Sequence, residues 1–457
     1  MKKTIIQVII VIILVALLGG LIWYALKSDS NENISNSNLQ NQGQIQREPG
    51  KNGGEPGGES PSSSSVETSG ATEVNNTQTL NGTYTTSSAD VSAIKVSDGG
   101  NATIDGATIN KTGGDSSNTE NSEFYGVNAG VLTTKGSTTT IKNSTISTNA
   151  KGSNAVFATG ENAKVYISNT TITTTGSSSS RGLDATYGGY IEADAVTVTT
   201  QGGSCATLAT DRGEGTVIAK NSKLETNGSG SPIIYSTGDI SILNTTGTAN
   251  ESQMVVIEGK NSATVTDSTL VASGKGNRGD TDQCGIMIYQ SMSGDASEGT
   301  GTFTATNSSL TVDQNSNYYK TAPMFFITNT DAVINLTNTK LNYGSNILIS
   351  AKGTSEWGNS GSNGGNLRLN ATNQTLEGNI EVDNISTVTM NLKSGSNYTG
   401  TINAANSAKS ITLKLDSSSK ITLTGDSYVT SIEDSDSSYS NINFNGYKLF
   451  VNGTAIN

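Results

Sequence analysis

The amino-acid sequence predicts an all-β fold, a parallel β-solenoid of short stacked strands that follows an N-terminal transmembrane helix and a disordered linker. A short phrase recurs at steps of 23 to 26 residues, which is the signature of a solenoid. Apolar and polar residues alternate in short runs, as they do in strands with one buried face. Gly supplies 52 of the 457 residues, and no stretch after the first 27 residues has the 3.6-residue period of an amphipathic helix.

The composition excludes several classes of function. Lys and Arg number 27 and Asp and Glu number 39, so the formal net charge is −12. We expect no nucleic-acid partner, because affinity for phosphates comes from clustered Lys and Arg. The sequence contains no histidine, which removes Ser-His-Asp and Cys-His catalysis and most zinc sites.

Residues 1–27 are predicted to form a transmembrane signal-anchor helix. Lys2 and Lys3 precede an apolar run, and about 20 apolar residues are enough to cross a bilayer. Trp23 and Tyr24 suit the membrane interface and make a poor cleavage site, while a cleaved signal peptide is the alternative. The positive-inside rule predicts a single-pass protein of the cell membrane, with a cytoplasmic N-terminus and an extracellular bulk.

Residues 28–75 are predicted to be a disordered linker. They are mostly Ser, Asn, Gln, Gly, Glu and Pro, and they include Pro49, Pro56 and Pro61. A segment with so few apolar residues cannot offset the entropy of ordering by burial, so we expect a flexible tether.

Residues 76–364 carry the repeat and are predicted to form the β-helix coils. Each copy has a β-rich pair, then Asn or Asp, two small residues and usually an aliphatic residue; the Asn or Asp stands at Asn143, Asn169, Asn221, Asn244, Asp267, Asn307 and Asn338. Asn tolerates a left-handed backbone and bonds to neighbouring main chain at turns. Each coil would hold about three short strands, stacked about 4.8 Å apart, with longer steps forming loops.

A second column of apolar positions runs in step with the first: Val156, Leu183, Ala206, Ile233, Met254 and Met324. In this alignment Cys205 and Cys284 share one position of the repeat, with two coils between them. They would lie about 14 Å apart, whereas the Cα atoms of bridged cysteines lie within about 7 Å. We therefore expect two unpaired cysteines.

Residues 365–457 are predicted to form terminal β-helix coils and a cap. Residues 388–392 and 411–415 alternate cleanly between apolar and polar side chains. Residues 423–429 and 444–449 resemble the last coils of bacterial β-helix surface proteins, and we interpret them as turns that cover the open end of the stack.

The chain after the linker resembles the right-handed parallel β-helix, the pectin-lyase-like fold, and especially its Ser-, Thr- and Asn-rich, adhesin-like bacterial members. The resemblance implies an architecture but no single activity, because this fold carries lyases, hydrolases, adhesins and plain stalks. Hydrolases of the family share an Asp-Asp pair and a Gly-His-Gly motif, and this sequence has neither.

The candidates for catalysis are Asp184, Asp211 and Arg212, which lie near Arg181 and Glu214 in neighbouring copies of the repeat. Glycoside hydrolysis needs two carboxyl groups that face one cleft. Asp184 stands between two apolar residues, so its side chain should point outward. The simpler interpretation is a set of exposed charges at turn corners, which contribute little to stability.

Trp357 is the candidate for ligand binding, because it is the only Trp outside the anchor and lies in a Gly/Ser/Asn-rich loop. An exposed indole could stack on a sugar ring, whereas packing against the coil is the simpler interpretation. The tripeptide 278–280, Arg-Gly-Asp, matches an integrin ligand but is short enough to occur by chance. We expect no cofactor; Asn and Asp corners could hold Ca²⁺, but the nonapeptide calcium repeat is absent.

Thr-x-Thr phrases recur at 171–173, 197–199, 264–266 and 302–304. Regular Thr ladders on a flat face occur in ice-binding solenoids, but Thr is also simply a good outward strand residue, which is the interpretation we favour.

These observations lead us to expect a membrane-anchored extracellular β-helix protein. It would act as an adhesin-like or structural surface stalk and bind glycans or a cell-surface protein. The alternative is a polysaccharide lyase or glycoside hydrolase on an extracellular glycan, which would need converging carboxylates and Arg or Lys on one face.

Overall fold

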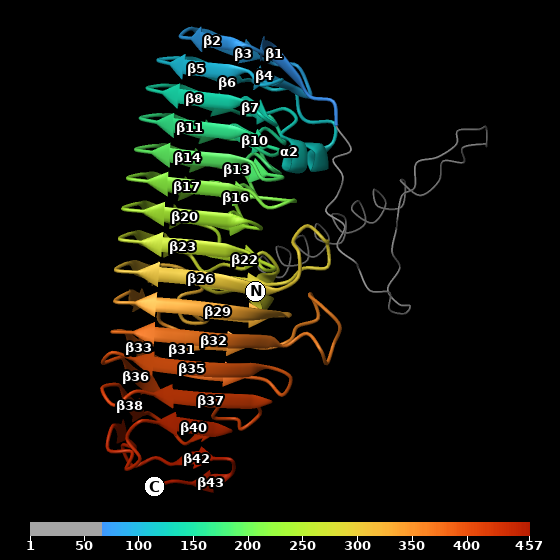
Figure 1. Ribbon diagram of the computed structural model, residues 1–457. Helices are drawn as coiled ribbons and strands as arrows, with labels where there is room; N and C mark the ends of the chain where they lie inside the picture. Colours follow the sequence, from blue (N-terminus) through green and yellow to red (C-terminus); the bar gives the residue numbers. More distant parts are fainter. Residues whose placement is uncertain (1–65) are drawn as a thin grey trace, which may run out of the picture. The chain divides into compact units, whose positions relative to one another are not determined.

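The computed structural model describes residues 66–457, so the predicted transmembrane helix and most of the predicted linker lie outside the described residues. Within residues 66–457 no helix is long and apolar enough to cross a membrane. These residues form a parallel β-helix, in which short strands follow one another around a coil and each coil stacks on the one before it (Figure 1). The predicted all-β solenoid is confirmed.

Three long parallel sheets form the faces of the coil, because every third strand joins the same sheet for most of the chain. Sheet A contains β1 (Ser69–Val74), β4 (Val91–Val96), β7 (Val131–Thr134), β10 (Val156–Thr159), β13 (Leu183–Thr186), β16 (Leu208–Thr210), β19 (Ile234–Ser236), β22 (Val255–Glu258), β25 (Ile286–Tyr289), β28 (Phe325–Thr328), β31 (Ile347–Ala351) and β34 (Asn379–Val382). Sheet B contains β2 (Thr77–Leu80), β5 (Asn101–Asp105), β8 (Thr138–Lys142), β11 (Lys164–Ser168), β14 (Tyr190–Asp194), β17 (Thr216–Lys220), β20 (Asp239–Leu243), β23 (Ser262–Thr266), β26 (Thr300–Thr306), β29 (Thr330–Thr337), β32 (Gly365–Thr372), β35 (Thr387–Lys393), β37 (Ser410–Leu415) and β40 (Ser431–Asp434). Sheet C contains β3 (Thr83–Thr86), β6 (Thr108–Lys111), β9 (Thr145–Thr148), β12 (Thr171–Thr174), β15 (Thr197–Thr200), β18 (Lys223–Thr226), β21 (Thr246–Ala249), β24 (Thr269–Ala272), β27 (Ser309–Val312) and β30 (Lys340–Asn342).

In the last coils two small sheets replace sheets C and A: sheet D takes the place of sheet C, and sheet E follows sheet A through the bridge between Ile380 and Ile402. Sheet D contains β33 (Thr375–Glu377), β36 (Asn397–Gly400), β38 (Lys420–Leu423) and β41 (Ile442–Asn443). Sheet E contains β39 (Ser427–Val429), β42 (Leu449–Val451) and β43 (Thr454–Ala455), and its β42–β43 pair is the one antiparallel pairing within residues 66–457. This turn back of the chain ends the parallel stack.

The corner between sheets B and C explains the repeated Asn. Asn143, Asn169, Asn221, Asn244, Asp267, Asn307 and Asn338 all have φ between 46° and 50°, the left-handed region that Asn tolerates better than most residues. Neighbouring corners also bond to each other, since Nδ2 of Asn244 donates to Oδ1 of Asn221 over 2.7 Å. The role predicted for Asn at this turn is confirmed.

The small residue after each corner Asn forms a ladder of buried hydroxyl groups. Oγ of Ser222 accepts a hydrogen bond from the main-chain N–H of Val196 in the preceding coil (3.2 Å) and donates to the carbonyl of Lys220 (2.6 Å). In the next coil, Oγ1 of Thr245 accepts a hydrogen bond from the main-chain N–H of Ser222 (3.3 Å). Each hydroxyl thereby pairs a buried main-chain donor that the tight corner leaves without a strand partner.

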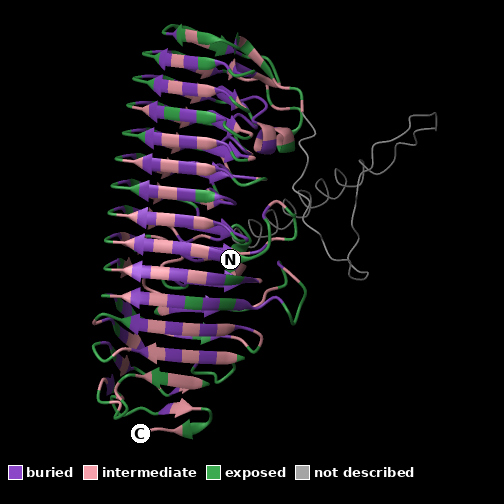
Figure 2. Ribbon diagram, viewed as in Figure 1, coloured by how far each residue is buried: buried purple, intermediate pink, exposed green. Residues whose placement is uncertain are grey.

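Burial distinguishes sheet A from the other faces. Strands of sheets B and C alternate between a buried inward residue and a more exposed outward one, which Figure 2 shows as stripes along sheet B. In sheet A every residue of β13, β22 and β28 is buried. The outward side of sheet A is therefore covered, and the loops that cover it hold the candidate site.

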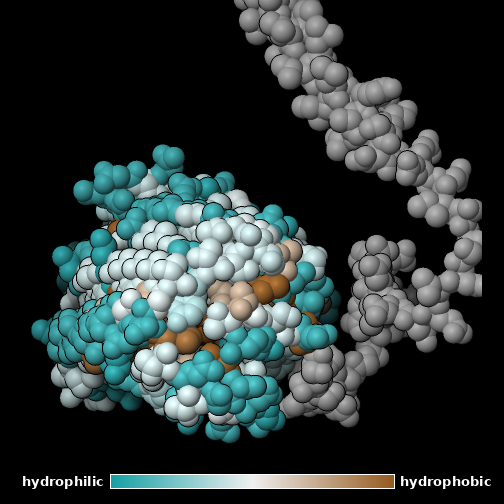
Figure 3. All heavy atoms as spheres, turned by 90° about the horizontal axis from the view of Figure 1, so that it is seen from above, coloured by the Kyte–Doolittle hydropathy of each residue, from teal (hydrophilic) through white to brown (hydrophobic). Residues whose placement is uncertain are grey.

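The end of the stack formed by β1, β2 and β3 has few apolar side chains at its surface. Viewed from this end, the molecule is largely hydrophilic with a few small hydrophobic patches (Figure 3). Val74 and Leu80, the apolar residues at the ends of β1 and β2, are 0% and 7% exposed.

The structure differs from the sequence prediction at one boundary and in one added element. The linker predicted to end at residue 75 ends earlier, because β1 already occupies Ser69–Val74; only Val74 of that strand is fully buried, so the strand lacks the apolar alternation that would reveal it. The helix α2 (Thr119–Tyr125) was not expected. The side chain of Asn118 caps its first turn and Gly126 ends it with φ of 68°, but seven residues are too few to show a helical period.

The register predicted for sheet A is correct at first and then slips. Leu183 pairs with Val156 as predicted, but the next partners are Leu208 and Ile234 rather than Ala206 and Ile233. The first difference is a slip by two residues, which alternation with a period of two cannot detect. The second is a shift by one residue, which the sequence hides because Ile233 and Ile234 are both apolar and both buried. The cysteines are both buried and unpaired, as predicted.

Candidate functional site

The outer face of sheet A carries large and charged side chains under a cover of loops. At one outward register position the successive strands β10 to β28 present Phe157, Asp184, Ala209, Tyr235, Val256, Met287 and Phe326. The cover comes from α2, from the loop that contains the short 3₁₀ helix η1 (Gly279–Thr281), from residues 291–297 and from the loop around Trp357. Figure 1 shows α2 beside β10 and β13, on the outside of the coil.

Asp184 and Asp211 meet at one arginine. Nη1 of Arg181 lies 2.8 Å from Oδ2 of Asp184 and 2.7 Å from Oδ2 of Asp211. Asp184 is 0% exposed, Asp211 4% and Arg181 7%. The structure thus brings the two predicted carboxylates together, in neighbouring coils of sheet A.

The expectation that these charges are exposed at turn corners is wrong. Asp184 does point away from the coil interior, as predicted, since its neighbours Leu183 and Ala185 are in the core. The sequence pattern contains no information about what lies over that face, and α2, which joins from a preceding coil, covers it. Asp184 and Asp211 are therefore a buried ion-pair group and not a solvated one.

Burial dominates the titration of this group. It raises the pKa of Asp211 to about 7 against the opposing charge of Arg181, and it raises the pKa of Asp184 as well. Burial also works against the charge of Arg181, but the carboxylates of Asp184 and Asp211 outweigh it and raise the arginine's pKa. Oδ1 of Asp184 is buried without a hydrogen-bond partner. Near neutral pH the group therefore tends to keep one proton.

Arg212, the third predicted catalytic candidate, contacts two of the segments that cover sheet A. Its guanidinium lies 3.9 Å from the ring centre of Phe124 in α2, and Nη2 lies 2.5 Å from Oδ1 of Asp295. Its main-chain N–H donates to Oδ1 of Asp211 (2.9 Å). The side chain thus ties α2 to the 291–297 loop and does not point at a shared cleft with Asp184.

A second polar group on this face was missed from the sequence. Glu258, at the end of β22, is 1% exposed, and its Oε2 accepts hydrogen bonds from the hydroxyls of Tyr235 and Tyr289, each over 2.8 Å. Oγ of Ser291 donates to the other oxygen. Tyr235 would have been recognised as an outward neighbour of this site if the register of sheet A had been aligned correctly.

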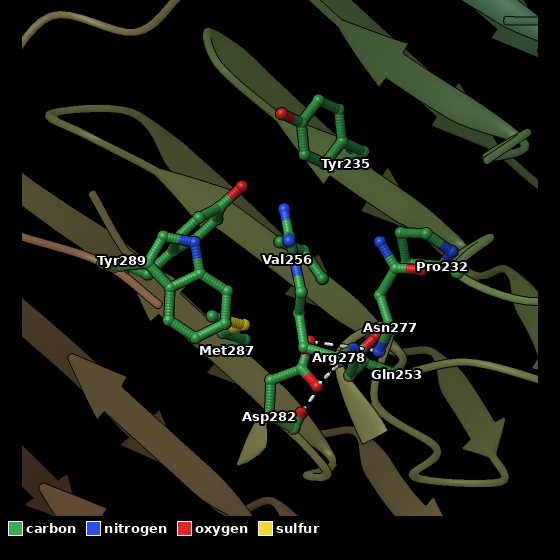
Figure 4. Close-up of a pocket in the computed structure, with 11 residues that line it drawn as sticks. Pro232, Tyr235, Gln253, Val256, Asn277, Arg278, Asp282, Met287 and Tyr289 are labelled. Carbon is green, nitrogen blue, oxygen red and sulfur yellow. Dashed lines mark hydrogen bonds between the residues drawn. The ribbon is translucent and has the colours of Figure 1, made fainter. Parts of the chain in front are cut away.

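A pocket lies beside these tyrosines, as Figure 4 shows. It is a small hollow of about 100 Å³ that opens to solvent, and its walls include Tyr235, Val256, Met287, Tyr289, Trp357 and Arg278. Val256 and Met287 are outward residues of sheet A and form the floor. The side chain of Arg278 is 58% exposed and reaches across the pocket in Figure 4.

Trp357 packs into the cover and also borders the pocket. It is 7% exposed and joins Val256, Met287 and Phe326 in a small apolar cluster on the outside of sheet A. Its ring meets that of Tyr289 edge to face, with centroids 5.3 Å apart. The indole is therefore a wall and not the exposed platform that would stack broadly on a sugar.

The loop that carries Arg278 is held by its own aspartate. The main-chain N–H groups of Asn277 and Arg278 donate to the carboxylate of Asp282 over 3.0 and 2.8 Å, and burial raises the pKa of that carboxyl. The guanidinium of Arg278 comes only within 3.8 Å of Glu356. Arg278 is thus turned into the pocket with most of its donors free, while Asp280 of the same tripeptide is exposed.

In the part of the chain that the structure describes, no group of three or more Cys, Asp or Glu side chains is arranged to hold a metal ion. The nearest arrangement of carboxylates, Asp184 with Asp211, already contains the guanidinium of Arg181.

One comparison with known proteins matches the chain. Residues 129–297, from just before β7 to the loop after β25, match the family described as "Right handed beta helix region". No curated protein and no solved structure matched. The β-helix family that this region matches includes both enzymes and non-enzymes. The match and the stacked parallel strands together identify this part of the chain as a right-handed parallel β-helix, the fold that the resemblance implied.

Proposed function

We propose that this protein is an adhesin-like surface β-helix that binds glycans in the pocket on the outer face of sheet A. The observation that carries the proposal is the composition of that pocket. Its floor is apolar (Val256, Met287) and one wall is aromatic (Tyr289, Trp357). The rest of the lining is polar and includes the half-exposed guanidinium of Arg278, whose ion-pair partner Glu356 lies 3.8 Å away. Apolar walls with a few convergent polar groups are typical of ligand sites.

Each part of the pocket suits one feature of a sugar. The apolar floor and aromatic edges fit the C–H face of a pyranose ring. Asn277, which is exposed at the rim, offers an amide to hydroxyl groups. Arg278 would pair with a carboxylate or sulfate substituent, because a guanidinium binds such groups through two parallel hydrogen bonds. We therefore favour an acidic glycan.

Binding is favoured over hydrolysis because the carboxylates near the pocket are already engaged. Asp184 and Asp211 are buried against Arg181. Glu258 is buried against two tyrosines, and Asp282 is bonded to its own loop. A glycosidase needs one carboxyl group beside the leaving oxygen and a second one facing water or the anomeric carbon.

A glycan array with neutral and acidic members tests the proposal, with product release measured on the same glycans. We expect binding without turnover, and a loss of at least about tenfold in affinity in Arg278→Ala, since a charge-assisted pair contributes about 1.5–3 kcal/mol. Arg368→Ala is the matched control, because Arg368 is an exposed arginine on β32 of sheet B. Turnover would favour the lyase or hydrolase alternative, and equal affinity in both variants would remove the pocket from the proposal.

The proposed protein is held at the membrane by residues 1–27, with the β-helix outside the cell. The apolar run behind Lys2 and Lys3 supports this part of the proposal. Fractionation of expressing cells tests it. The full chain is expected in the membrane fraction and accessible to protease added to the cells. A chain that lacks residues 1–27 is expected outside the membrane fraction and inaccessible to the protease.

A further inference from the structure

Three carboxyl groups surround one guanidinium where α2 meets sheet A. Asp184 on β13 and Asp211 after β16 both contact Arg181. Glu123 comes from α2, accepts a hydrogen bond from Oγ of Ser179, and interacts electrostatically with Arg181 and both aspartates. With every group ionised, this acidic group would carry three negative charges and one positive charge.

The cation next to the group is shared with another carboxylate. Arg212, which follows Asp211, interacts electrostatically with Asp211 but is paired directly with Asp295 of the 291–297 loop. The ring of Tyr235 on β19 lies 5.6 Å from the guanidinium of Arg181, and its hydroxyl donates to Glu258 on β22.

The remaining titratable groups on the packed elements are neutral. Burial raises the pKa of Cys205, behind Arg181, to about 11, and burial keeps the hydroxyl of Tyr289 on β25 protonated, with its pKa well above the usual value. Tyr187, at the end of β13, stacks on Tyr125 of α2 with centroids 5.4 Å apart, and burial raises its pKa. The group of four residues must therefore balance its own charge.

One buried carboxylate oxygen of the group has no hydrogen-bond partner and can accept a proton. Oδ1 of Asp184 belongs to a side chain with 0% exposure and has no hydrogen-bond partner, although Oδ2 is well paired. A buried anionic oxygen without a donor is costly. A single proton on the Asp184–Asp211 pair removes one negative charge and gives the pair a donor of its own.

If the proton leaves, α2 is the element that can yield. Asp184 and its neighbours are fixed by parallel pairing on both sides. The seven residues of α2 are held by side contacts. These include hydrogen bonds from Oγ1 of Thr186 to the carbonyl of Phe124 (2.8 Å) and from Nδ2 of Asn154 to the carbonyl of Ser122 (3.0 Å), the Phe124–Arg212 contact and the Tyr125–Tyr187 stack. Glu123 is the only one of the three carboxylates that can move away without breaking a sheet.

We propose that Glu123, Arg181, Asp184 and Asp211 form a proton-operated latch. With a proton on the Asp184–Asp211 pair, α2 stays packed on sheet A; when the proton leaves, α2 loosens and water reaches the outer face of the sheet. This regulation does not depend on whether the pocket binds a glycan.

The direction of the response follows from the two states. In the closed state Asp211 keeps its proton up to about pH 7, because burial raises its pKa to about 7. In an open, hydrated state the carboxyl would lose its proton near the usual pKa of about 3.9. Opening therefore releases a proton between these values, and the opening equilibrium rises by up to about tenfold per pH unit, then levels off above about pH 7.

Hydrogen–deuterium exchange of the full-length protein between pH 5 and pH 8, corrected for the intrinsic exchange rate, tests the latch. For the peptide that contains α2, we expect the opening equilibrium constant to increase at least about tenfold from pH 5 to pH 7 and to change little from pH 7.5 to pH 8. Peptides from β11 and β14 of sheet B should show no such change. Asp211→Asn keeps the shape without the titration, so its α2 should not respond to pH.

Two variants on α2 keep the test decisive if Asp211→Asn does not fold. Glu123→Gln removes the charge that faces the group and should weaken the response, whereas Glu120→Gln removes an exposed charge from the same helix and should retain the full response. The proposal is overturned if α2 of the natural sequence does not respond between pH 5 and pH 7. It is overturned equally if Asp211→Asn responds fully, or if Glu123→Gln responds as strongly as Glu120→Gln.

Discussion

The outer faces of sheets A and C belong to the same coil and differ in almost every respect. Sheet C presents hydroxyl side chains in register, such as Thr145, Thr171 and Thr197, and these lie open to solvent. Sheet A presents Phe157, Asp184 and other large side chains, and loops cover them. The strands themselves are alike, so the difference comes from the connections between them.

The connections explain where the chemistry gathers. Between sheets B and C, two residues join the strands in every coil from β2–β3 to β29–β30, and two residues also join β32 to β33 of sheet D. The connections on either side of sheet A vary, from the single residue Asn329 between β28 and β29 to the segments that hold α2, η1 and Trp357. A constant corner keeps the coil regular, and variable corners on both sides of one sheet build a second layer over that sheet.

If the outer face of sheet A is a second core, loss of Arg181 should be the most damaging single change. Arg181→Met leaves two buried carboxyl groups without their cation, which costs about 3–5 kcal/mol in the free energy of unfolding at pH 7.5. Urea unfolding measures this cost. The cost should shrink at pH 5, because Asp184 and Asp211, whose pKa values are already raised by burial, are then protonated.

Lys164→Met is the matched control for Arg181→Met, since Lys164 is an exposed cation on β11 of sheet B. It should change stability by less than about 0.5 kcal/mol. Equal effects of the two substitutions would mean that the cover of sheet A contributes no more than an ordinary surface.

The two faces also differ in how far the sequence predicts them. The corner Asn, the inward alternation of sheets B and C and the unpaired cysteines follow from short-range rules, because each depends on residues that are close in sequence or repeat at one period. The burial of Asp184 depends on α2, which lies some 60 residues earlier at Thr119–Tyr125 and carries no periodic signal of its own. The direction of Asp184 could therefore be predicted, and its environment could not.

The pocket shows the same limit. Trp357 stands out by composition, but the residues that share its pocket, such as Tyr289 and Arg278, come from other coils. Their meeting depends on the register of sheet A, in which a slip by two residues leaves the apolar alternation intact. The lengths and conformations of the loops determine which residues line the pocket, and the sequence repeat predicts neither.

The constant corner between sheets B and C should show a moderate cost when its buried hydroxyl is removed. Ser222→Ala leaves the main-chain N–H of Val196 without an acceptor, and an unpaired buried donor costs about 1–3 kcal/mol. Ser222→Thr keeps the hydroxyl, as Thr245 does one coil later, and should restore most of the stability. Thermal unfolding of the two variants compares them, and an equal loss in both would point to packing in place of the hydrogen bond.

The smallest effect is expected on the outer face of sheet C. Replacing Thr171, Thr197 and Thr199 together by Val removes three outward hydroxyl groups without changing side-chain shape, and β-branched Val is an equally good strand residue. The free energy of unfolding should change by less than about 0.5 kcal/mol for each substitution, and glycan binding should be unchanged, because the pocket lies on sheet A. Glycan-array binding and thermal unfolding of this triple variant measure both. A loss of binding without a loss of stability would reverse the comparison: the bare Thr ladder, and not the covered face, would then be the surface that recognises a ligand.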